Sequence, residues 1–171
     1  MCLKELSLIR KAEITDCMNL AALSLQVWLH TYATQGLCSQ ISSYVLSNFT
    51  ENHFVNLINN HAVDIRVFEK DSHLIGFIVV DLESKFEASV DTGFEVATLY
   101  VSEHFHGIGV GRQLIQEVKR LHGVPFWLST WTENHDALGF YDKLGFEIVG
   151  ELHFSLDGEL HQNHVLAYNG T

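Results

Sequence analysis

A glycine-rich segment, His106-Gly107-Ile108-Gly109-Val110-Gly111, constrains the fold more than any other part of the chain. The apolar run 96–101 before it is strand-like, and residues 112–118 after it are helix-like. A strand, a glycine turn and a helix N-terminus together form an anion site, because the first helical turn has unpaired N–H groups and glycine lets a ligand approach the backbone. Glycine also marks ordinary turns, so this segment alone leaves both interpretations open.

Two nucleotide-binding motifs are excluded. In a dinucleotide fingerprint the third glycine comes one residue later, and an acidic residue follows about twenty positions on, where this chain has Pro125-Phe126-Trp127-Leu128. A phosphate-binding P-loop would end in Gly-Lys-Ser/Thr, which is absent here.

A second motif follows: residues 134–146 read Asn-x-x-Ala-x-x-Phe-Tyr-x-x-x-Gly-Phe. Together with Leu99-Tyr100-Val101 and the glycine turn, it resembles the GNAT superfamily of N-acetyltransferases, and specifically its small-amine and polyamine members. The resemblance is at motif level for residues 94–150 and by element order elsewhere. One departure is His106, where the family usually has Arg or Gln.

The pattern predicts an α/β (α+β) fold. Polar turns, including 70–73, separate the elements. Strands are expected near 6–10, 62–69, 74–82, 94–101, 125–130, 146–156 and 160–168. Helices are expected from a cap at Thr15, over 38–48, from a cap at Thr50 to about 59, and over 109–122 and 134–144. The resemblance implies the same order: a mixed, mostly antiparallel sheet of about seven strands with helices on both faces.

Length and composition indicate one domain over residues 1–171, with no linker or repeat, and the resemblance implies that it is a GNAT domain. The apolar run 74–80 is too short to span a bilayer, and the N-terminus lacks a signal-peptide core, so no membrane association is expected. Cys2, Cys17 and Cys38 form no C-x-x-C pair, which favours free thiols and a cytoplasmic location, with Cys17 and Cys38 buried.

The net charge of −11 argues against nucleic acid as a partner. It is compatible with a cationic acceptor, although an acidic surface also simply aids solubility. Coenzyme A, a polyanion, would then be held locally by backbone amides and Arg112.

The resemblance assigns roles on the 134–144 helix. Tyr141 would protonate the departing thiolate, since a phenol with a pKa near 10 is matched to a thiol that titrates at roughly 8–9. Asn134, seven residues earlier on the same helix face, would contact the pantetheine arm, or simply cap the helix. The backbone of 99–101 would pair with pantetheine like an added strand. The expected cofactor-binding residues are Leu99, Tyr100, Val101, His106, Gly107, Ile108, Gly109, Val110, Gly111, Arg112, Asn134 and Tyr141.

Glu95 is the candidate general base, because several GNAT enzymes take a base from this strand. In a regular strand it shares a face with Leu99, four residues on, whereas a bulge would break that parity. The alternative is that Glu95 only orients the substrate ammonium or is solvated.

Trp28, Tyr32 and Trp131 are the candidate acceptor contacts, because aromatic faces attract ammonium groups. Trp28 and Trp131 could equally serve the core. The eleven histidines do not indicate a metal, since His161 and His164 point to opposite faces of a strand.

We therefore predict an acetyl-coenzyme-A-dependent N-acetyltransferase that transfers the acetyl group directly to a small cationic amine, without a metal, as a monomer or homodimer. The alternatives are a protein N-terminal or lysine acetyltransferase and a non-catalytic acyl-coenzyme-A sensor.

Overall fold

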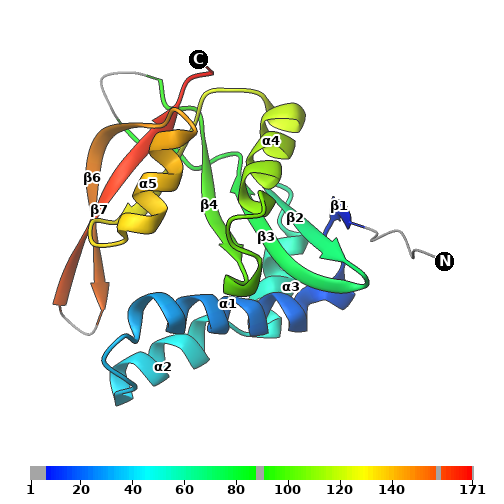
Figure 1. The fold of residues 1–171 in the computed structure, drawn as a ribbon, viewed down its shortest axis with the longest axis vertical. Coiled ribbons are helices and arrows are strands. Elements are labelled where there is room, and N and C mark those ends of the chain that lie inside the picture. Colours follow the sequence, from blue (N-terminus) through cyan, green and yellow to red (C-terminus); the bar gives the residue numbers. More distant parts are fainter. Residues whose placement is uncertain (1–6, 88–90, 157–158, 171) are drawn as a thin grey trace.

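A seven-stranded sheet forms the centre of the protein (Figure 1). The computed structural model describes residues 7–87, 91–156 and 159–170. The strand order is β1-β2-β3-β4-β5-β7-β6, with β4 and β5 parallel and the other neighbours antiparallel. The mixed, mostly antiparallel sheet is thus confirmed. The strands are β1 (Ser7–Lys11), β2 (Val63–Lys70), β3 (His73–Asp81), β4 (Phe94–Val101), β5 (Phe126–Trp131), β6 (Glu147–Leu156) and β7 (Glu159–Tyr168).

Helices cover both faces of the sheet, as predicted (Figure 1). On one side, the α1 face, α1 and α3 pack on the sheet and α2 packs on α1. On the other side, the α4 face, lie α4 and α5. The helices are α1 (Cys17–Tyr32), α2 (Ser39–Asn48), α3 (Glu51–Asn59), α4 (Val110–His122) and α5 (His135–Lys143).

Strand β3 shows how the sheet separates two cores. Phe77 is fully buried on the α1 face with Leu20 of α1, and its neighbour Ile78 is fully buried on the α4 face with Leu114 of α4. Successive side chains of a strand point to opposite faces, so an unbroken apolar strand supplies both cores.

One of the two predicted helix caps is confirmed. The Thr50 side chain accepts a hydrogen bond from His53 N–H at the start of α3. The prediction for Thr15 is wrong, because it lies inside a 3₁₀ turn, Ile14–Asp16. Asp16 organises that turn instead: its carboxylate accepts from Glu13 N–H at 2.8 Å and pairs with Arg10 at 2.7 Å.

Cys17 is buried, as predicted, but Cys38 is exposed just before α2. The burial prediction for Cys38 is therefore wrong, and the physical reason is that Cys38 is the N-cap residue of α2, a helix that packs mainly on α1. Cys2 lies outside the described residues. Among the described helices, none is both long and apolar enough to cross a membrane.

Candidate active site

Strands β4 and β5 meet only at their beginnings. Phe94 pairs with Phe126 and Glu95 with Trp127, and no pair follows. Beyond this apex β4 stays paired with β3 and β5 with β7, so the two strands diverge (Figure 1). The inner edge of β4 over 99–101 therefore keeps backbone groups that an extended ligand can pair with.

A bulge in β4 changes which face Glu95 occupies. Val96 pairs with Val80 and Thr98 with Val79, so Ala97 is an extra residue. Leu99 consequently packs on the α4 face, whereas Glu95 lies beside Trp127 on the α1 face. The expectation that Glu95 shares a face with Leu99 is wrong because the bulge breaks the alternation.

Glu95 is half-buried at the apex of the diverging strands. Ser84 Oγ donates a 2.6 Å hydrogen bond to Glu95 Oε2. Burial raises the pKa of Glu95, the Ser84 hydrogen bond opposes that rise, and the charge of Asp81 adds to it. A carboxylate with a raised pKa is a better proton acceptor. Sequence reasoning missed Ser84, since it follows β3 in a loop with no motif of its own.

Tyr141, a residue of α5, is buried, with only 8% of its surface exposed. Its ring contacts Phe140 and Phe146. Burial raises the pKa of Tyr141 above its ordinary value, and the nearby Tyr32 adds to the rise. The phenol therefore keeps its proton at neutral pH, as a proton donor must.

Asn134 is the N-cap of α5. Its side-chain oxygen accepts from Ala137 N–H at 3.1 Å, which is the capping geometry considered from the sequence. Its amide N–H groups have no partner among the described residues, so the side chain can still donate to a ligand.

The glycine segment forms the turn into α4. Gly107 and Gly109 have φ values of 77° and 91°, which glycine adopts without strain. Gly111 has a different role, because a Cβ there would lie only 3.1 Å from Phe140 Cζ, so its absence lets the Phe140 ring of α5 lie against α4. Gly109 is the N-cap of α4, and Arg112 is exposed in its first turn. The backbone around Gly107 and Gly109 is uncrowded, so a ligand can approach the first N–H groups of α4.

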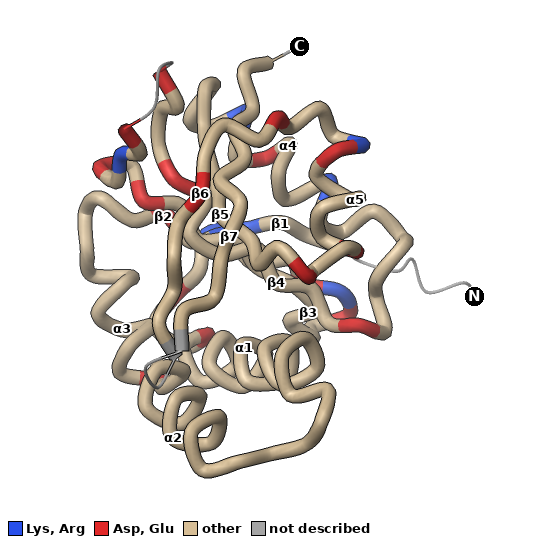
Figure 2. Tube along the Cα trace, turned by 90° about the vertical axis from the view of Figure 1, so that its left-hand side faces the viewer, with Lys and Arg blue, Asp and Glu red and all other residues tan. Residues whose placement is uncertain are grey.

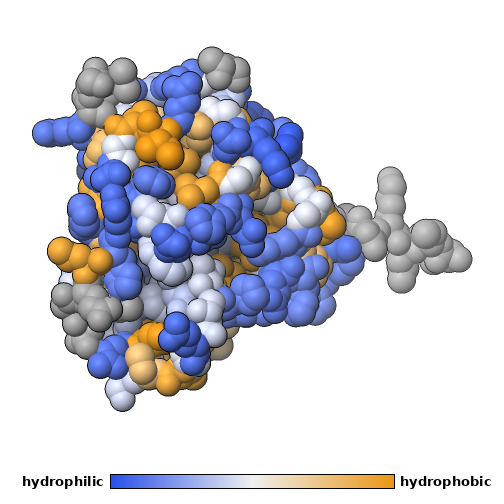
Figure 3. All heavy atoms as spheres, turned by 60° about the vertical axis from the view of Figure 1, so that its left-hand side comes forward, coloured by the Kyte–Doolittle hydropathy of each residue, from blue (hydrophilic) through white to orange (hydrophobic). Residues whose placement is uncertain are grey.

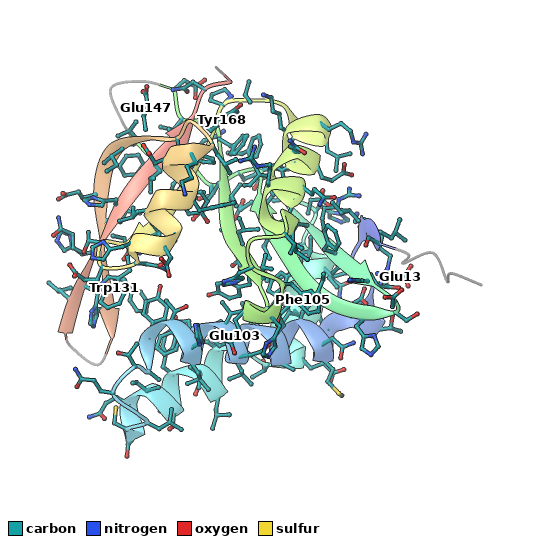
Figure 4. All side chains as sticks on the ribbon, viewed as in Figure 1. Glu13, Glu103, Phe105, Trp131, Glu147 and Tyr168 are labelled. Carbon is teal, nitrogen blue, oxygen red and sulfur yellow. The ribbon has the colours of Figure 1, made fainter. Side chains whose placement is uncertain are left out.

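Histidines tie this turn to its surroundings. His106 Nε2 lies 2.9 Å from Val101 O, at the end of β4. His30 of α1 lies 2.9 Å from the carboxylate of Glu103, which Figure 4 shows above α1. His30 and His106 line one small cavity of about 30 Å³. The end of β4 and the glycine turn are therefore braced against α1.

Aromatic rings connect α1 to the C-terminal strands. Tyr32 lies 4.6 Å from Trp28 and 5.4 Å from Trp131, measured between ring centroids. Tyr44 of α2 joins them at 5.0 Å from Trp28, and Phe154 of β6 lies 5.6 Å from Tyr44. The three predicted acceptor residues are thus brought together. Tyr44 and Phe154 were missed, and nothing local in their sequence marks them.

His161 and His164 lie in regular register on β7, so they point to opposite faces as expected. Among the residues that the structure describes, no three side chains of His, Cys, Asp or Glu gather as a metal site requires.

Comparison with known proteins defines the class. Residues 59–148 match the family model described as an acetyltransferase (GNAT) domain. The chain belongs to this family, whose members transfer an acetyl group from acetyl-coenzyme A. The protein is therefore an acetyl-coenzyme-A-dependent N-acetyltransferase of the GNAT type.

Individual relatives agree with that class. An uncharacterised N-acetyltransferase of Mycobacterium bovis is 25% identical over 88% of this chain and 94% of its own. The PaiA N-acetyltransferase of Thermoplasma acidophilum, solved with coenzyme A, has a TM-score of 0.74 at 22% identity over 95% of this chain and 99% of its own. YncA, a putative acetyltransferase of Salmonella typhimurium solved with acetyl-coenzyme A, has a TM-score of 0.60 at 18% identity, covering 95% and 93%.

Proposed function

We propose that the acceptor of this acetyltransferase is a small primary amine that is cationic in solution and is acetylated directly in a ternary complex. One observation carries the proposal: the bulge at Ala97 puts Glu95 on the α1 face, opposite the α4 face from which the glycine turn and α4 would hold the cofactor. An amine approaching from the α1 face would meet a carboxylate at the apex of the diverging strands.

In the proposed reaction the amine loses a proton to Glu95, directly or through water. Its lone pair then attacks the thioester carbonyl carbon, and a backbone N–H of β4 stabilises the oxyanion. The carbon–sulfur bond breaks, and the Tyr141 O–H gives its proton to the thiolate. As the amide forms, the nitrogen loses its second proton, which restores the Tyr141 phenol through water, and Glu95 returns its proton to solvent. Burial favours the protonated phenol that Tyr141 needs, and the Ser84 hydrogen bond favours the carboxylate that Glu95 needs.

Aromatic faces would hold the cation before it is deprotonated. Tyr32 and Trp131 offer π faces on the α1 side, where α1 carries no acidic residue. A single ammonium next to an apolar body matches Glu95 and several rings. Helices α1 and α2 supply no carboxylate for further ammonium groups, so we favour a monoamine-sized acceptor.

A thiol-release assay across monoamines, spermidine, amino acids and peptides tests this proposal. We expect the highest kcat/KM with a monoamine, and its loss in Glu95→Gln. Preference for a peptide would instead identify a protein acetyltransferase. Tight acetyl-coenzyme A binding without release of thiol with any acceptor would identify a sensor.

A further inference from the structure

A basic groove lies between α4 and α5. Its cavity of about 210 Å³ is lined by three cations, Arg112 and Lys119 of α4 and Lys143 of α5. The remaining lining residues are Ile115, Gln116, Leu144 and Tyr168. In a chain with 10 Lys and Arg against 21 Asp and Glu, three cations around one cavity are a marked local excess. The groove lies on the α4 face, whereas the rings of Trp28, Tyr32 and Trp131 lie toward the α1 face.

The cations of this groove are not neutralised by carboxylates. Of the four arginines, Arg10, Arg66 and Arg120 are ion-paired, whereas Arg112 has no carboxylate partner among the described residues. Lys143 also has no ion-pair partner among the described residues. Exposed cations left unpaired around a cavity provide a binding surface for an anion.

Lys119 is held in place by a neutral group. Its Nζ donates a 2.9 Å hydrogen bond to the Tyr168 hydroxyl and lies 5.0 Å from the centre of that ring. Tyr168 is itself buried, at the end of β7 (Figure 4). The phenol uses one of the three ammonium donors and none of the charge. Lys119 is therefore positioned with two donors free for a ligand.

The groove continues from the glycine turn. Arg112 directly follows Gly111, and Arg112, Gln116 and Lys119 lie on one stripe of α4. The stripe from Arg112 to Lys119 rises about 10 Å along the helix. A ligand whose pyrophosphate lies at the turn would thus have the groove within reach of its next charged group. Coenzyme A carries such a group, a phosphate on the 3′ position of its ribose.

We propose that Lys119 and Lys143 bind the 3′-phosphate of coenzyme A and make the enzyme discriminate against dephospho-coenzyme A. This inference rests on the proposed placement of the pyrophosphate at the glycine turn. It explains how an acidic protein retains a polyanion: the long-range repulsion from a net charge of −11 is overcome locally at three unpaired cations.

Calorimetry with coenzyme A and dephospho-coenzyme A tests the proposal, because the two ligands differ only in the 3′-phosphate. The wild type should bind coenzyme A about tenfold or more tightly than dephospho-coenzyme A. Lys119→Met with Lys143→Met should remove that preference while leaving dephospho-coenzyme A affinity within about twofold. Lys11→Met, an exposed lysine on β1, serves as the matched control and should keep the preference.

Tyr168→Phe removes the hydrogen bond that positions Lys119 and should reduce the preference part of the way, with Lys143 still present. Equal affinities of the wild type for the two ligands would overturn the proposal and leave the proposed function standing. Equal loss for both ligands in the double variant would also overturn it, since that is a general effect of charge. If the wild type bound neither ligand, the pyrophosphate site itself would be wrong.

Discussion

The two sides of the diverging strands differ in charge. Residues 17–50, which include α1 and α2, contain no Asp, Glu, Lys or Arg, and Figure 2 draws both helices without a charged residue. The segment from Glu103 to Glu147, which includes α4 and α5, contains four of the ten cations and six acidic residues. The α1 side presents rings and apolar atoms instead: Leu37 and Leu46 are about two-thirds exposed, and Figure 3 shows hydrophobic atoms at the lower end of the molecule, over α2.

This difference argues against the view that the net charge alone attracts a cationic acceptor to the site. The net charge of −11 suggests a field that gathers cations, but the helices beside the aromatic rings contribute nothing to it. Attraction between exposed charges also falls off within about 8–10 Å at ordinary salt. We therefore propose that recognition on the α1 side comes from Glu95 and from ring faces, whereas recognition on the α4 side depends on charge. The two sides should respond differently to mutation and to salt.

The largest effect is expected at Tyr141, a buried residue of α5. Tyr141→Phe keeps the buried ring and removes only the hydroxyl group that would donate the proton, so kcat should fall by roughly 10²–10⁴. Affinity for acetyl-coenzyme A, measured by calorimetry, should stay nearly unchanged. Turnover within about twofold of the wild type would assign thiolate protonation to solvent or to another group.

The second-largest effect is expected from a negative charge placed at the glycine turn. A Cβ at Gly109 would meet only Gln113 Nε2, at 3.8 Å, and the φ of this residue is 91°. Gly109→Asp adds a negative charge facing the proposed pyrophosphate site, so acetyl-coenzyme A affinity should fall at least about tenfold. Gly109→Asn has the same shape without the charge and tolerates the left-handed backbone, so its loss should be several-fold smaller. Equal affinities for the two variants would remove the phosphates from this turn.

Glu95 should show its role in the pH profile. Glu95→Gln should lower kcat/KM at neutral pH by about 10–100-fold and abolish the acidic limb that its ionisation produces. Activity requires the carboxylate, so in the wild type this limb rises as pH increases through the raised pKa of Glu95. Ser84→Ala removes the hydrogen bond that favours the carboxylate, which should move the limb to higher pH. A Glu95→Gln profile parallel to the wild type would make Glu95 structural.

Local signals account for what could be predicted from the sequence. The turn with Gly107 and Gly109, the cap at Thr50 and the position of Tyr141 on α5 depend on neighbours within a few residues. The cap at Thr15 failed because Asp16, one residue on, forms an ion pair with Arg10 that organises the turn.

Other features arise only from tertiary contacts. The bulge at Ala97 follows from the register of β4 against β3, and it moved Glu95 to the opposite face. Tyr32 and Trp131 meet although 99 residues separate them in the chain. Lys119 and Lys143 likewise come together from two helices and carry no shared motif.

The smallest effect is expected on the α1 side, at Trp131. Trp131→Leu removes a π face but no charge, so the acceptor KM should rise about 2–5-fold, which corresponds to the 0.5–1 kcal/mol of an exposed cation–π contact. Trp131→Phe keeps an aromatic face and should restore part of the affinity. Affinity for acetyl-coenzyme A should be the same in both variants.

Measured across an ionic-strength series, the ratio of mutant to wild-type acceptor KM should stay constant, because no ion pair has been removed. The preference for coenzyme A over dephospho-coenzyme A should shrink over the same series, since salt screens exposed cations. A Trp131 effect that disappears with salt would show that charge governs both sides of the site.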